Sequence, residues 1–200
     1  CGIVSLTMLS SGVSAAPVIY SYNGNNFDTF VGDTHDATHA VTGRMVLPDL
    51  LGPNLFNFSP NPDFFSFSDG VNTISSNDLL PGGFDGSFFE VDTDSEGRIT
   101  FWTVSIFDQP GPGSELGDIS RSIRTENTFR GFEAGGEVVD IGANGVCVAV
   151  GSDGCSIFDV STGEVAENPG TWTVVPLPAT LPMLGPALAG LFAVRWNRRA

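Results

Sequence analysis

Three acidic residues stand at alternate positions in the polar segment DTDSEGRI, residues 92–99. Asp92, Asp94 and Glu96 precede Gly97, a spacing like that of the first half of an EF-hand calcium loop. Such a loop ends in a bidentate Glu at its twelfth position, where this chain has Thr103, and the flanking segments are strand-like. A solvated hairpin turn with Gly97 at positive φ explains the same residues. We therefore favour the turn, assign no metal or other cofactor, and keep Ca²⁺ as the alternative.

Two histidines lie four residues apart in the segment DTHDATH. His35 and His39 are accompanied by Asp33 and Asp36, and on a helix this spacing would place both imidazoles on one face, where zinc binds. The threonines and the neighbouring strand-like sequence argue against a helix. We expect an exposed loop without a metal.

Catalytic residues are not evident elsewhere in the chain. Hydrolysis needs a nucleophile beside a base, or two carboxylates that face each other across a cleft. Acidic residues are numerous, but no motif pairs them, and both histidines lie in one loop. We therefore predict that the protein is not an enzyme, and we keep a secreted hydrolase as the less favoured alternative.

The cysteines indicate a disulfide. Cys147 and Cys155 lie on either side of VAVGSDG, with strand-like sequence flanking a turn at 152–154. In an exported protein this spacing suits a disulfide across a hairpin, and two buried thiols are the alternative. The remaining cysteine, Cys1, falls in the N-terminal targeting segment described below.

The elements that must position these residues are short strands. The 25 glycines and 13 prolines disfavour long helices. About ten β-rich runs are separated by turn signals, and the Asp69-Gly70 dipeptide predicts a tight hairpin. We predict an all-β fold over residues 16–174, an antiparallel two-sheet sandwich of jelly-roll-like type, followed by a short C-terminal hydrophobic helix.

Charge excludes one class of partner. All 23 acidic residues lie between Asp28 and Glu167, lysine is absent, and the formal net charge is −15. Such a surface repels nucleic acid and anionic lipid headgroups. We therefore predict an acidic exported protein that does not bind nucleic acid.

The N-terminal segment, residues 1–15, has the features of a partial secretory signal peptide. An apolar stretch is followed by small residues, with Val13 and Ala15 at the −3 and −1 positions of a cleavage site. This predicts a mature chain that begins at Ala16. A lipoprotein with lipidated Cys1 is the alternative, but no lipobox is visible.

The C-terminal segment contains an uncharged apolar run. Leu177–Val194 would span roughly 27 Å as a helix, close to the hydrocarbon thickness of a bilayer. Arg195, Arg198 and Arg199 follow and provide a positive cytoplasmic stop. The run is too uniformly apolar and too close to the terminus for a core helix, which is the alternative.

Residues 175–200 resemble the tripartite PEP-CTERM sorting signal in its VPLPA variant. The motif residues are Val175, Pro176, Leu177, Pro178 and Ala179, and the apolar run and the arginine cluster complete the pattern. In that family an exosortase in the membrane reads the signal. The resemblance therefore implies an exosortase as processing partner, a transient stay in the inner membrane, and delivery to the cell surface or extracellular matrix. A sortase signal is the alternative, but Leu181 replaces the glycine that it requires.

Together these features predict an exported surface or matrix protein of structural or adhesive role, associated with exopolysaccharide. Tyr20, Tyr22, Trp102 and Trp172 are candidate sugar platforms, although aromatic residues on strands more often face the core. A calcium-dependent carbohydrate-binding module is the alternative binding function.

Overall fold

Apolar and polar residues alternate along most of the segments predicted to be strands, and this alternation puts one face of most strands in the core. The computed structural model describes residues 17–79, 85–110, 114–128, 138–151 and 154–176, which contain strands and no helix. The strands are β1 Val18–Asn26, β2 Thr29–Val31, β3 Ala40–Leu47, β4 Phe64–Ser68, β5 Thr73–Ser75, β6 Gly86–Thr93, β7 Ile99–Asp108, β8 Ile119–Asn127, β9 Val138–Gly151, β10 Gly154–Ala166 and β11 Thr171–Pro176. The predicted all-β class is confirmed.

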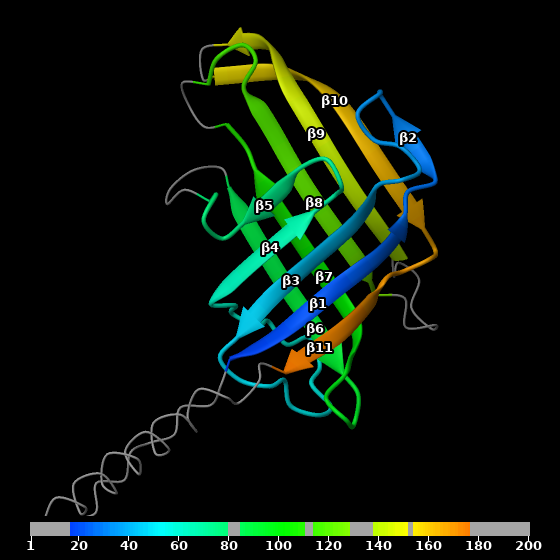
Figure 1. The fold of residues 1–200 in the computed structure, drawn as a ribbon. Helices are drawn as coiled ribbons and strands as arrows, with labels where there is room; N and C mark the ends of the chain where they lie inside the picture. Colours follow the sequence, from blue (N-terminus) through cyan, green and yellow to red (C-terminus); the bar gives the residue numbers. More distant parts are fainter. Residues whose placement is uncertain (1–16, 80–84, 111–113, 129–137, 152–153, 177–200) are drawn as a thin grey trace, which may run out of the picture. The chain divides into compact units, whose positions relative to one another are not determined.

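The strands form two antiparallel sheets. Sheet A has the order β11-β1-β3-β4-β5, and sheet B has the order β2-β10-β9-β8-β7-β6. Figure 1 shows the two sheets stacked face to face, with the strands of sheet A crossing those of sheet B. The predicted two-sheet antiparallel sandwich is therefore confirmed.

Strand connectivity differs from the jelly-roll-like pattern that we expected. β3 to β5 are consecutive neighbours in sheet A, and β6 to β10 are consecutive neighbours in sheet B. The β4–β5 and β6–β7 hairpins contain Gly70 and Gly97 at positive φ, a conformation that glycine adopts without steric cost. Such short turns keep successive strands side by side, whereas a jelly roll requires connections that alternate between sheets.

The two ends of the sequence lie outside the described residues. The predicted signal peptide at 1–15, the apolar run at 177–194 with its helix, and the arginine cluster all fall there. No helix long and apolar enough to cross a membrane occurs among the residues that are described. β11 extends to Pro176, so the first two motif residues, Val175 and Pro176, belong to sheet A.

The core lies between the two sheets and is rich in aromatic residues. Tyr20, Tyr22 and Trp102 are buried, and Trp172 packs against the same cluster. The four aromatics therefore face the core, as is more usual for aromatic residues on strands, and the candidate role as sugar platforms is not supported. The other buried hydrophobic residues of this cluster are Phe27, Val41, Met45, Leu47, Leu51, Phe65, Phe67, Ile74, Phe89, Val91, Val104, Ile106, Ile123 and Val165.

The predicted disulfide is present. Cys147 on β9 and Cys155 on β10 are bonded across the hairpin, with their Cα atoms 5.8 Å apart. This separation is within the range usual for disulfides. The local spacing of the two cysteines was sufficient to predict the bond, because a hairpin turn brings both strands together.

A buried polar cluster joins the two sheets through Asp140 of β9. The Tyr22 hydroxyl on β1 donates to Asp140 Oδ1 at 2.7 Å, and the Gly170 backbone N–H donates to the Tyr22 oxygen at 2.9 Å. Trp102 Nε1 donates to Thr125 Oγ1 at 2.9 Å beside the same carboxylate. Burial raises the pKa of the Asp140 carboxyl to about 6, although hydrogen bonds from Thr125 and Tyr22 oppose this effect.

The raised pKa predicts how stability depends on pH. Between about pH 4 and pH 6 the folded state retains a proton on Asp140 that the unfolded state releases, so the free energy of unfolding falls as pH rises. In Asp140→Asn the amide cannot ionise, so the variant does not lose stability in this way. As pH rises from 4 to 7, we expect its free energy of unfolding to increase by roughly 3 kcal/mol relative to that of the wild type. Urea unfolding at several pH values measures this difference. Asp28→Asn, at an exposed position, is the control and should follow the pH dependence of the wild type. If the free energy of unfolding of Asp140→Asn has the same pH dependence as that of the wild type, the prediction is contradicted.

Candidate functional site

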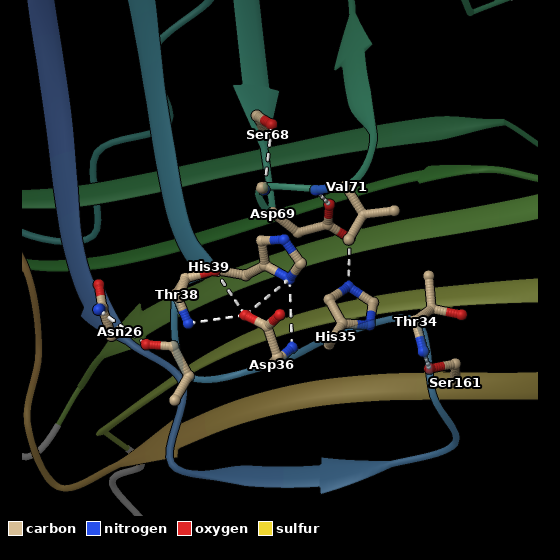
Figure 2. Close-up of polar contacts among 12 residues, drawn as sticks. Asn26, Thr34, His35, Asp36, Thr38, His39, Ser68, Asp69, Val71 and Ser161 are labelled. Carbon is tan, nitrogen blue, oxygen red and sulfur yellow. Dashed lines mark hydrogen bonds and ion pairs between the residues drawn. The ribbon is translucent and has the colours of Figure 1, made fainter.

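The histidine segment folds into the connection between β2 and β3, and Figure 2 shows its two imidazoles close together. His35 is buried, and its Nε2 lies 2.9 Å from Asp69 Oδ2. Asp69 lies in the β4–β5 turn, where its Oδ1 also accepts the backbone N–H groups of Val71 and Asn72. His35 and Asp69 therefore connect the β2–β3 loop to the turn of the neighbouring hairpin.

Our expectation of an exposed loop is wrong for His35. Two glycines of sheet B provide the space: a Cβ atom at Gly142 would overlap the Asp69 side chain, and one at Gly163 would crowd Phe27 and His35. The ring of Phe27 also packs against the imidazole, with centroids 5.6 Å apart. The loop is held inward because the sheet beneath it lacks side chains at these positions.

The remaining residues of the segment do not converge on one point. His39 Nδ1 accepts the backbone N–H of Asp36 at 3.2 Å, and Asp36 Oδ1 accepts that of Thr38 at 2.7 Å. Asp33 is exposed. Within the described part of the chain, no group of three or more His, Cys, Asp or Glu side chains could hold a metal ion. The local hydrogen bonds instead fold the loop onto itself (Figure 2).

His35 and Asp69 have a structural role in this arrangement. The two side chains are 0% and 1% exposed, so a substrate does not reach the imidazole. A buried carboxylate that loses a hydrogen-bond donor is costly, because its charge is then poorly compensated. The pair therefore holds the β4–β5 hairpin of sheet A against the β2–β3 loop.

This role predicts a graded loss of stability. His35→Ala removes the donor to Asp69 and leaves a cavity, so we expect a loss of about 3 kcal/mol in the free energy of unfolding. His35→Gln places an amide N–H where Nε2 was and should recover part of the loss. Urea unfolding measures both variants. Equal stability of His35→Ala and wild type would show that the pair does not hold the hairpin.

The three acids of the β6–β7 hairpin also have structural partners. Asp92 Oδ1 accepts the backbone N–H of Asn57 at 2.7 Å, and the Asp94 backbone oxygen accepts that of Asn54 at 2.9 Å. Asp94 Oδ2 and Glu96 Oε2 lie 2.7 and 2.9 Å from the guanidinium of Arg98. The acids thus close the hairpin turn and fasten the β3–β4 loop to it, in agreement with the turn interpretation.

The β3–β4 loop, residues 48–63, encloses an apolar pocket of about 390 Å³. Asn54 and Asn57 of this loop have positive φ. Leucine and proline residues form most of the lining of the pocket. Its carboxylate groups are Asp49 and Asp63, and its lining contains no cationic side chain. The pocket provides few groups that could orient a polar ligand.

A different surface presents ordered polar groups: the outer face of sheet A. Because cross-strand partners point to the same side of a sheet, the register defines two rows of side chains across all five strands. The first row is Thr173, Ser21, Arg44, Ser66 and Ser75, and the second row is Thr171, Asn23, Thr42, Ser68 and Thr73. We call these ten positions the hydroxyl face.

The hydroxyl face has a shallow, widely open depression at its centre. An open hollow of about 350 Å³ is lined by residues that include Ser21, Thr42, Arg44, Ser66 and Thr73. Neighbouring strands lie about 4.8 Å apart, so the rows present hydroxyl groups at regular intervals. A hydroxyl group can both donate and accept hydrogen bonds, although the Ser68 and Ser75 hydroxyls already donate within the chain, to the Asn72 backbone oxygen and to Asp78 Oδ2. The face therefore suits a polymer whose own hydroxyl groups recur regularly.

Charge distinguishes this face from the other sheet. Eight of the ten positions are serine or threonine, and none is acidic. On the outer face of sheet B, Glu90, Thr103 and Glu126 instead form a cross-strand row with two carboxylates. The ten positions themselves thus contain no acid, and Asp78 beside them accepts a hydrogen bond from the Ser75 hydroxyl at 2.6 Å, at the β5 end of the first row.

Sequence reasoning missed the hydroxyl face, although a signal was present. In segments such as YSYN, VTGRMV and FFSFS, serine or threonine occupies positions between the core residues. Alternation predicts that these residues face outward, but it does not show which strands become neighbours. Register alone aligns Ser21 with Arg44 and Ser66, which are distant in the sequence.

Comparison with protein-family models, with curated proteins and with solved structures finds no match to this chain.

Proposed function

We propose that the protein is an exported, exosortase-sorted domain with a structural or adhesive role at the cell surface or in the extracellular matrix, where it contacts polysaccharide. The observation that carries this proposal is the hydroxyl face, with its two rows of hydrogen-bonding side chains around a hollow of about 350 Å³. Polysaccharide chains present repeated hydroxyl groups that such rows can match without a catalytic group. The proposed activity is binding.

The face is preorganised for this role. Its side chains stand on strands, and the inner side of the same strands is held by the buried residues Tyr22, Phe67 and Ile74. The register that aligns the outer rows also aligns this inner row. Ordering the side chains on binding therefore costs less than it would on a loop.

The terminal strands support the proposal of a sorted protein. β1 begins at Val18, two residues after the predicted mature start, and pairs antiparallel with β11. Ile19 and Val18 oppose Val175 and Pro176, so the beginning of the sorting motif is part of the sheet. Pro176 has no N–H to donate, which suits the last position of an edge strand. The rest of the motif, residues 177–179, follows this strand in the sequence.

Intact-mass analysis of the protein recovered from its host tests the sorting proposal. We expect a chain that starts at Ala16 and lacks the residues beyond about Ala179, because signal peptidase and exosortase each remove one end. A mass that includes Arg195, Arg198 and Arg199 would show that the tail is retained as an anchor.

Polymer binding tests the role of the hydroxyl face. We expect the purified protein to be retarded in native gels that contain polygalacturonate, its methyl ester or dextran. The double variant Thr42→Val, Ser66→Ala removes two hydroxyls with little change of shape and should weaken binding about tenfold. Leu50→Ala, in the pocket of the β3–β4 loop, is the control and should bind like wild type. Absence of retardation of the wild type in every polymer would contradict the proposal.

A further inference from the structure

The hydroxyl face has one charged member, Arg44, at the centre of the first row. Arg44 is exposed on β3 between its cross-strand partners Ser21 and Ser66, and it lines the hollow. Its guanidinium carbon lies 5.4 Å from the centroid of the Phe64 ring. The ring attracts the guanidinium by a cation–π interaction and leaves its charge uncompensated.

Arg44 differs from the other arginines that the structure describes. Arg98, Arg121 and Arg124 each form an ion pair with at least one carboxylate. Among the described residues, no carboxylate lies within ion-pair distance of Arg44. Arg44 is therefore an exposed cation whose charge is not paired with a described carboxylate, in a chain with 23 acidic residues.

From this arrangement, and on the basis of the proposed function, we infer that the hydroxyl face selects an acidic polysaccharide and that Arg44 binds its carboxylate groups. A guanidinium binds a carboxylate through two parallel N–H···O bonds, a geometry that fits the sugar acids of such polymers. The serine and threonine rows on either side then bind the hydroxyl groups of the adjoining sugar units.

The charge of the rest of the molecule gives this site its specificity. The net charge of −15 repels an anionic polymer from most of the surface, and screening limits this repulsion to about 8 Å at physiological ionic strength. The ten positions of the hydroxyl face carry one cation, Arg44, and no anion, and the carboxylate of Asp78 lies beside Ser75 at the β5 end of the first row. An acidic chain therefore meets a cation unpaired with any described carboxylate along these rows, whereas on the outer face of sheet B Arg124 is paired with Glu126 and Glu90 adds a further negative charge.

Polygalacturonate and its methyl ester provide the test, because they share one backbone and differ in charge. We expect the wild type to bind the acid form at least about tenfold more tightly than the ester in calorimetric titrations. Arg44→Gln should lose this preference by weakening binding of the acid form alone. Arg44→Lys keeps the positive charge but cannot form the bidentate pair with a carboxylate, so it should retain part of the preference for the acid form.

Arg124→Gln is the matched control, because it makes the same change in net charge on the outer face of sheet B. It should leave the preference unchanged, and the unfolding midpoint of each variant verifies its fold. If the wild type binds both polymers equally, or Arg44→Gln keeps the preference, the inference about Arg44 fails while the polysaccharide-binding function stands. If the wild type binds neither polymer nor dextran, the proposed function fails as well.

Discussion

The register of sheet A is the constraint on which both the core and the binding surface depend. Backbone pairing of β1 with β3 and β11 places Tyr22 beside Gly43 and Trp172 on the inner face. The same pairing necessarily places Ser21 beside Arg44 on the outer face, because side chains alternate along a strand. A shift of one residue would expose the aromatic row and bury the hydroxyls. The register that packs the core therefore also aligns the outer rows.

Buried polar groups hold the two sheets in this arrangement. Asp140 binds Tyr22 across the sandwich, and Asp69 binds His35 over the two glycines of sheet B. Buried charges stabilise a fold weakly in comparison with apolar residues, but they penalise any packing in which their partners are absent. The inner faces of this sandwich thus combine an apolar core, which drives folding, with polar contacts that disfavour other alignments of the sheets.

Surface charge is distributed unevenly over the fold, and this distribution connects the structure to the proposed function. Acids close hairpins, fasten the β3–β4 loop and form a row on sheet B, whereas the hydroxyl face contains none. An acidic protein that is to bind an acidic polymer needs such a separation. Arg44 has the Phe64 ring as its neighbour in place of a carboxylate, so its charge stays available to a ligand.

The sequence by itself determined the features that depend on neighbouring residues: the strands, the hairpins at Gly70 and Gly97, and the disulfide. Alternation, turn chemistry and cysteine spacing act over a few residues and can be recognised without a fold. The tertiary structure alone decided that His35 is buried, that Asp92 fastens a loop, and that Arg44 lies within rows of hydroxyls. These features bring together residues far apart in the chain, and strand register and sheet stacking determine which of them meet.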